Sequence, residues 1–332
     1  MEQRPLGRTS ATVSAVGLGI MTFGSQTDEA DAFEQLDLAA AAGIDLFDVA
    51  ENYPSPGDAE TQGRSEEILG RWLQQRGARD RSVVATKVTG PNGWPYIRGE
   101  HRRLDRDNIR AAVEGSLRRL RIDHIDLYQV HWPDRLNSTF TRPRFRPLVD
   151  PAEMVPLEET LGFMSELVDE GKVRHAGVAN ETPWGVMRYL GAAAQRGLPR
   201  IASIQNGYSL LDRRFETGLA EVAMQEAVGL IAYSPLGRGQ LTGKRLPEDA
   251  SDDGRVDSAV RVYVEIARRH GLSPAAMALA FVRQQPFVTS VLMAASRVDQ
   301  LRENLKSIDV TLSREVIKEI DAVHDADPNP GW

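Results

Sequence analysis

The chain has 332 residues, and its 40 Lys and Arg against 47 Asp and Glu give a formal net charge of −7 at pH 7. Apolar residues make up 41% and charged residues 26%, which is typical of a folded globular protein and excludes a disordered chain. The acidic balance argues against nucleic acid as a partner, because phosphate polymers attract basic surfaces. Cysteine is absent, so disulfides, thiolate nucleophiles and cysteine-ligated metal centres are excluded.

Residues 1–10 contain no apolar leader, and no run of about 18 apolar residues occurs in the sequence. We therefore expect a cytoplasmic protein that has no membrane partner. The six histidines show no metal-ligand spacing, so we expect no bound metal.

The predicted elements begin with a hairpin, because Met1–Leu6 and Thr12–Val16 flank the turn-forming sequence Gly7-Arg8-Thr9-Ser10. Eight short apolar runs are predicted as strands: Val16–Gly19, Leu46–Asp48, Ser82–Lys87, Asp126–His131, Val173–Val178, Ala202–Gln205, Gly229–Tyr233 and Val288–Leu292. The segments between them have the periodicity of amphipathic helices, clearest in Asp105–Leu120, Leu157–Glu170, Thr182–Gln195, Arg213–Glu226, Ser273–Gln285 and Ser313–Ala322. Asp105 is a predicted N-cap.

Eight alternating strand and helix units predict an α/β fold, a (β/α)8 TIM barrel that forms a single domain over residues 1–332. The N-terminal β-hairpin is expected to plug the barrel bottom. An open doubly wound sheet is the alternative, but the glycine fingerprint of dinucleotide-binding sheets is missing. Gly17-Leu18-Gly19 lacks the third glycine, since Thr22 occupies its position, and Gly237-Arg238-Gly239 is followed by Gly243, one residue late. Gly243-Lys244 is not a P-loop, because the position of the earlier glycine is Arg238.

Residues that carry chemistry fall where predicted strands end, which is where a barrel places its active site. Three strand ends provide Asp48, Lys87 and His131. Tyr53 follows Asp48 by one short loop. Taken singly, each of these residues has a structural alternative, such as a helix cap, a packed loop aromatic or a buried histidine. Their coincidence at one rim favours a shared catalytic role.

These four side chains suit the protonation of a carbonyl oxygen. An ammonium group near a phenol is expected to lower the pKa of the phenol, and a carboxylate beside Lys87 keeps the lysine charged. A histidine can orient the substrate oxygen or relay a proton. Tyr53 would then protonate the oxygen while a hydride reaches the carbon. A Schiff-base reaction at Lys87 is the alternative, and it requires a neutral lysine that the neighbouring Asp48 disfavours.

The sequence resembles the aldo-keto reductase family over essentially its whole length, most closely the bacterial Tas-type branch, which is related to the potassium-channel β subunits. The matching segments are Leu6-Gly7-Arg8-Thr9, Gly17-Leu18-Gly19, Phe47-Asp48-Val49-Ala50-Glu51-Asn52-Tyr53, Ala85-Thr86-Lys87, Leu127-Tyr128-Gln129-Val130-His131-Trp132-Pro133, Gly171-Lys172-Val173-Arg174, Gln205-Asn206, Tyr233-Ser234-Pro235-Leu236 and Gln300-Leu301-Arg302-Glu303-Asn304. The resemblance implies a catalytic tetrad of Asp48, Tyr53, Lys87 and His131, with Tyr53 as the general acid.

The resemblance also implies that NADPH binds extended across the barrel mouth. The cofactor residues that it implies are Gly19, Ile20, Met21, Asp48, Asn180, Gln205, Tyr233, Ser234, Pro235, Leu236, Gly237, Arg238, Gly239, Leu241, Lys244, Ser296, Arg297, Gln300, Glu303 and Asn304. Among them Gln205 would hold the carboxamide, Tyr233 would stack on the nicotinamide, and the segment from Ser234 to Leu241 would wrap the pyrophosphate. Ser296, Gln300, Glu303 and Asn304 would hold the adenosine end, and Lys244 and Arg297 are the cations expected at the 2′-phosphate.

Three positions depart from the family pattern. Ala179 replaces a serine that would bond the carboxamide, and Ala294 replaces a glycine next to the adenosine site. The predicted loop from Leu246 to Val256 is short and acidic, where relatives carry a longer basic clasp over the cofactor. NADH use is therefore left open beside NADPH.

Two long loops, Val88–Leu104 and Trp132–Pro156, are expected to shape the substrate pocket. Aromatic and apolar residues that could line it are Met21, Phe23, Tyr53, Trp94, Tyr96, Trp132, Phe140 and Phe145. The function expected from all of this is NADPH-dependent reduction of a small-molecule aldehyde or ketone. An NADP(H)-binding regulatory subunit, in which turnover is incidental, is the alternative.

Overall fold

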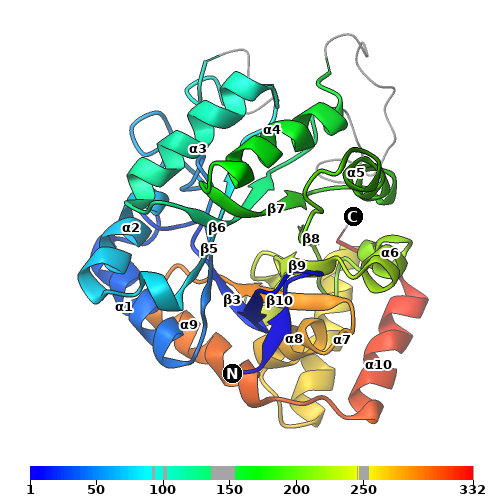
Figure 1. Ribbon diagram of the computed structural model, residues 1–332. Helices are drawn as coiled ribbons and strands as arrows, with labels where there is room; N and C mark the ends of the chain where they lie inside the picture. The colour runs from blue at the N-terminus through cyan, green and yellow to red at the C-terminus, as the bar shows by residue number, and fades with distance from the viewer. Residues whose placement is uncertain (92–93, 100–102, 136–153, 245, 247–253, 332) are drawn as a thin grey trace.

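The structure is a computed structural model that describes residues 1–91, 94–99, 103–135, 154–244, 246 and 254–331. Eight parallel strands form a closed barrel with helices around it (Figure 1), in the order β10-β3-β4-β5-β6-β7-β8-β9. Their bounds are β3 Val16–Gly19, β4 Leu46–Asp48, β5 Val83–Val88, β6 Ile125–Val130, β7 Val173–Ala179, β8 Ser203–Gly207, β9 Gly229–Tyr233 and β10 Val288–Met293. This closed sheet confirms the predicted (β/α)8 barrel and rules out the open doubly wound sheet.

The barrel interior is built in layers because side chains alternate across each strand. Leu46, Ala85, Leu127 and Ile231 belong to one apolar cluster, and each is fully buried. Two residues further along the same strands lie Asp48, Lys87, Gln129 and Tyr233. The apolar layer is therefore followed by a polar layer at the carboxyl ends of the strands.

A hairpin closes the other end of the barrel, as the sequence predicts. Strand β1 (Gln3–Pro5) pairs antiparallel with β2 (Thr12–Ser14), and Leu6 and Val13 pack fully buried against the apolar layer. The Ser14 amide donates to Asp45 Oδ1 at 2.7 Å, which fixes the hairpin to the residue just before β4.

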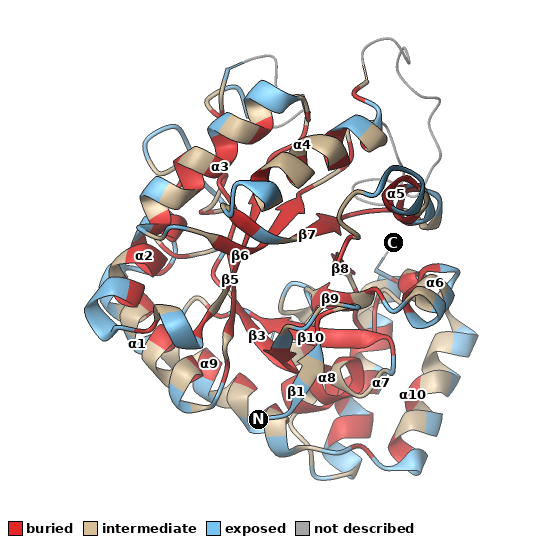
Figure 2. Cartoon of the chain, viewed as in Figure 1, coloured by how far each residue is buried: buried red, intermediate tan, exposed pale blue. Residues whose placement is uncertain are grey.

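The helices present buried faces to the barrel and exposed faces to solvent (Figure 2). Their bounds are α1 Glu29–Ala41, α2 Arg64–Arg76, α3 Arg106–Leu120, α4 Leu157–Asp169, α5 Pro183–Arg196, α6 Leu219–Glu226, α7 Arg255–Arg269, α8 Pro274–Arg283, α9 Val298–Leu305 and α10 Arg314–Ala326. The 3-10 turns within the described residues include η1 Arg79–Arg81, η3 Arg214–Glu216, η4 Gln240–Thr242 and η6 Lys306–Asp309. Asp105 caps α3 as predicted, accepting from the Asn108 amide at 3.0 Å. In the described part of the chain, no helix combines the length and apolarity needed to cross a bilayer.

Some predicted bounds were wrong. The expected helix Arg213–Glu226 is interrupted, because Gly218 adopts φ 96° and the regular helix α6 begins only at Leu219. The expected loop Leu246–Val256 ends earlier, since α7 already begins at Arg255, and residues 247–253 lie outside the described residues. Strand β6 ends at Val130, so His131 lies one residue past the strand.

Candidate active site

A cavity of about 1620 Å³ opens at the carboxyl ends of the strands. Gly19, Asp48, Tyr233 and Met293, each the last residue of its strand, line it. Among the four tetrad residues, Asp48, Tyr53 and His131 line the cavity, whereas Lys87 is completely buried behind its wall.

Lys87 is held by two oxygen acceptors. Its Nζ donates to Asp48 Oδ2 at 2.6 Å and to the Val49 carbonyl at 2.8 Å. Burial lowers the pKa of Lys87, while the carboxylates of Asp48 and Glu66 act in the opposite direction. Because Lys87 does not reach the cavity wall, a substrate carbonyl has no direct path to its nitrogen, which disfavours the Schiff-base alternative.

Tyr53 lies between the lysine and the histidine. Lys87 Nζ is 5.2 Å from the centroid of the Tyr53 ring, and the Tyr53 and His131 rings meet edge-on with centroids 5.7 Å apart. Burial raises the pKa of Tyr53 well above its usual range, and the charge of Asp48 raises it further. The expectation that Lys87 lowers the pKa of Tyr53 was therefore wrong, because burial, and after it the charge of Asp48, outweigh the effect of the ammonium group. Tyr53 carries its proton at neutral pH.

His131 is neutral at physiological pH, because burial and the nearby Lys87 charge hold its pKa well below the usual range. Its Nδ1 is buried and has no hydrogen-bond partner among the described residues. Asn180 fixes the backbone of His131, donating from Nδ2 to its carbonyl at 2.8 Å. Tyr233 in turn donates to Asn180 Oδ1 at 2.7 Å. The chain Tyr233–Asn180–His131 links three strand ends across the barrel mouth.

The predicted cofactor residues are largely brought together by the fold. Sixteen of them line the same cavity: Gly19, Met21, Asp48, Asn180, Gln205, Tyr233, Ser234, Pro235, Leu236, Arg238, Gly239, Lys244, Ser296, Gln300, Glu303 and Asn304. The other four, Ile20, Gly237, Leu241 and Arg297, do not contribute to the wall. Arg297 is instead exposed and paired with Asp299 at 2.9 Å, whereas Lys244 faces the cavity near the Glu303 carboxylate.

The departures from the family pattern have different surroundings. Ala179 is buried at the end of β7, and Ala294 is exposed on the cavity wall. Of the expected pocket residues, Met21, Tyr53, Trp94 and Trp132 line the cavity. Phe23 is buried in the core, and Tyr96 stacks on Trp94 without being part of the wall. Phe140 and Phe145 lie outside the described residues.

Gln129 is a site residue that the sequence analysis did not single out. It is fully buried, and its Nε2 lies 3.3 Å from Asp48 Oδ1. Gln205 donates to the same oxygen at 2.8 Å and also contacts Gln129 Oε1 at 3.3 Å. The signal was present, because Gln129 lies two residues before His131 and therefore on the inward face of its strand.

Comparisons with known proteins agree with this arrangement. A family model described as the aldo/keto reductase family matches residues 15–325. Protein tas of Escherichia coli K12 is 49% identical over 340 residues, which cover 98% of each chain. The uncharacterized oxidoreductase YrpG of Bacillus subtilis 168 is 33% identical, over 100% of this chain and 97% of its own. L-glyceraldehyde 3-phosphate reductase of Escherichia coli O157:H7 is 30% identical, over 97% of this chain and 92% of its own. With the closed barrel and its polar rim, these matches make the chain an oxidoreductase of the aldo/keto reductase family.

Proposed function

We propose that the protein transfers a hydride from NADPH to the carbonyl carbon of an aldehyde or ketone, with Tyr53 as the general acid. The observation that carries this proposal is the position of a protonated Tyr53 on a cavity wall, beside a neutral His131 and over the Lys87–Asp48 pair. One cavity is lined by Asp48, Tyr53 and His131 and by sixteen of the twenty residues predicted for the cofactor.

The donor set along the cavity fits an extended dinucleotide. At the tetrad end, burial raises the pKa of Tyr233 to about 12, so the ring is uncharged and offers a flat apolar face to a nicotinamide. In the middle, the segment after β9 has positive φ at Ser234, Gly237, Arg238 and Gly239, a backbone form that brings main-chain groups close to a ligand. At the far end, Lys244 provides a cation and Asn304 an amide.

Once bound, the nicotinamide supplies the hydride, and the protein supplies the proton and the orientation. Tyr53 and His131 would both donate to the carbonyl oxygen, since a neutral imidazole can offer one N–H. As the carbon accepts the hydride, the Tyr53 proton passes to the oxygen. The tyrosinate that remains is stabilised by the ammonium of Lys87, which Asp48 keeps in place.

Gln205 would exchange its hydrogen-bond partner when the cofactor binds. In the structure its Nε2 donates to Asp48, and its predicted role is to bond the nicotinamide carboxamide. Ala179 offers no hydroxyl to that carboxamide, so more of the carboxamide binding falls to Gln205.

We propose Lys244 as the residue that recognises the 2′-phosphate of NADPH. Lys244 forms no salt bridge among the described residues, although the Glu303 carboxylate lies near it, whereas Arg297 is held by Asp299. By sequence, residues 247–254 include four acidic residues and no Lys or Arg, so they offer no further cation to a 2′-phosphate, which keeps NADH use open.

The test is NADPH oxidation by the purified protein with a panel of aldehydes and ketones, repeated with Tyr53→Phe. The variant keeps the ring against Lys87 and His131 and removes only the acid. Tyr96→Phe is the matched control, because Tyr96 does not line the cavity. A kcat in Tyr53→Phe close to that of the unaltered protein contradicts the assigned acid. NADPH binding without turnover of any carbonyl would contradict the reductase and favour the regulatory alternative.

A further inference from the structure

The segment 234–243, here called the cofactor strap, rests on two side chains from elsewhere in the fold. A β-carbon at Gly237 would lie 2.9 Å from Leu211 Cδ1, and one at Gly243 would lie 2.8 Å from Val264 Cγ2. Distances this short mean that the strap backbone lies directly on Leu211 and Val264. Both glycines also have positive φ, 54° and 73°, so no other residue type replaces them without strain.

The two supports are joined to each other. Val264 belongs to α7, and its neighbour Tyr263 donates from its hydroxyl to the Leu210 carbonyl at 3.1 Å. Leu211 follows in the loop between β8 and η3. The same loop approaches the nicotinamide end of the cavity, since the Tyr208 amide donates to the Tyr233 carbonyl at 3.2 Å.

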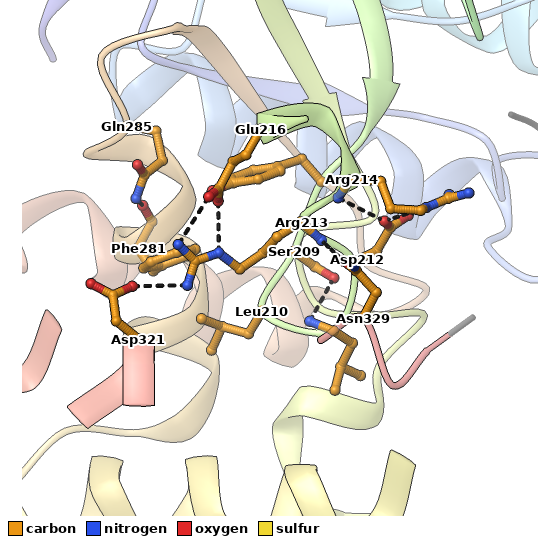
Figure 3. A network of polar contacts seen from close by, with 12 residues as sticks. Ser209, Leu210, Asp212, Arg213, Arg214, Glu216, Phe281, Gln285, Asp321 and Asn329 are labelled. Atoms are coloured by element: carbon orange, nitrogen blue, oxygen red, sulfur yellow. Dashed lines mark hydrogen bonds and ion pairs between the residues drawn. The ribbon is translucent and has the colours of Figure 1, made fainter. Parts of the chain in front are cut away.

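Arg213 fixes this loop to the outer helices (Figure 3). Its guanidinium bonds Glu216 Oε1 at 2.6 Å and Asp321 Oδ1 of α10 at 2.8 Å, and it lies 5.1 Å from the Phe281 ring centroid of α8. Only 10% of the Arg213 side chain is exposed. A largely buried guanidinium with partners on three elements holds the loop in one position.

Residues 327–331, which follow α10, bond the same loop through its backbone. Asn329 Oδ1 accepts from the Arg213 amide at 2.7 Å, and the Gly331 amide donates to the Leu211 carbonyl at 3.1 Å. Arg255, the first residue of α7, pairs with Asp327. The segment therefore holds both supports of the strap, Leu211 directly and α7 through Asp327.

We propose that Asn329 is a positioning residue for the dinucleotide, acting through Arg213 and Leu211 on the cofactor strap. This inference rests on the proposed function, because it assigns the strap to cofactor binding. Asn329 follows Asn304, the last predicted site residue in the chain, and it does not line the cavity. Its effect is on cofactor affinity and residence, with the chemistry of Tyr53 untouched.

The experiment compares two substitutions that both tolerate the φ of 53° at Asn329. Asn329→Gly removes the acceptor of the Arg213 amide, and Asn329→Asp keeps it. Losing one such bond corresponds to about a 2- to 10-fold change in an equilibrium constant. We expect Asn329→Gly to raise the NADPH Kd and the dissociation rate by that factor, with kcat at saturating NADPH unchanged and Asn329→Asp close to the unaltered protein.

Ser313→Ala separates positioning from stability. Ser313 caps the opposite end of α10, so its loss lowers thermal stability without touching the loop. We expect a lower Tm and an unchanged NADPH Kd. A second readout needs no cofactor: amide hydrogen exchange of 234–243 in the free protein should be faster in Asn329→Gly than in Ser313→Ala.

The outcomes distinguish the two proposals. If the unaltered protein binds NADPH and Asn329→Gly binds it equally well, the positioning role is overturned while the proposed function stands. If Ser313→Ala weakens binding as much as Asn329→Gly, the effect is one of general stability and the role is again overturned. If the unaltered protein binds neither NADPH nor NADH, both proposals fail.

Discussion

Removing Arg119 should destabilise the protein far more than removing an arginine from an exposed ion pair. Arg119 Nε donates to Glu66 Oε2 at 2.6 Å, and the Glu66 side chain is fully buried, with Thr86 Oγ1 bonding its other oxygen at 2.7 Å. Arg119→Met leaves this carboxylate buried with one hydroxyl for a partner. Breaking a buried pair from one side costs about 3–5 kcal/mol, and because 20% of Arg119 is exposed we expect about 3 kcal/mol.

The assay is urea unfolding of a double-mutant cycle, with Arg119→Met, Glu66→Gln and the combination. The combined variant should recover much of the loss, since no uncompensated charge remains. Arg106→Met is the control, because Arg106 is 59% exposed in its pair with Glu166 and should cost less than about 1 kcal/mol. A cost for Arg119→Met no larger than that of Arg106→Met would refute the reasoning, because it would mean that the buried carboxylate finds solvent or another partner.

Three further predictions concern the proposed site. Tyr53→Phe should lower kcat about 10²–10⁴-fold with an unchanged NADPH Kd, measured by steady-state kinetics and fluorescence titration. Lys244→Met should weaken NADPH binding by about tenfold and leave NADH binding unchanged, whereas Lys318→Met on α10 should alter neither. His131 has a lowered pKa, so its contribution to stability is present above the unfolded pKa of about 6.5 and is lost as pH falls. His131→Asn should therefore reduce the slope of unfolding free energy against pH below pH 6.5 by up to about 1.4 kcal/mol per unit, and an unchanged slope would contradict the assignment.

Much of the fold could be predicted because its signals are local. Strands β3, β4 and β9 have the predicted bounds. A short apolar run bounded by polar residues is typical of a buried strand, so its two ends can be read from the sequence. The helix break at Gly218 could not be predicted, because a glycine with positive φ and a helical glycine look the same in a sequence. That choice depends on how the loop after β8 packs.

The fold brings most of the predicted site residues to one cavity, and their functional roles stay predictions. The electrostatics of the site differ from what the sequence led us to expect. The pKa of Tyr53 depends on burial and on the 2.6 Å contact that neutralises Lys87, and neither is readable from spacing. The spacing of Gln129 from His131 indicates that it faces the barrel interior, but its contact with Asp48 depends on which strands lie opposite, which the sequence does not show.

The hairpin that closes the barrel bottom has a consequence for how reactants enter and leave the protein. With Leu6 and Val13 fully buried under the strands, the barrel interior has no passage at that end. Both reactants of the proposed reaction therefore share the opening at the carboxyl ends of the strands. If one reactant covers the other in this cavity, the covered one has to arrive first and depart last, and the closed barrel bottom then imposes an order of binding.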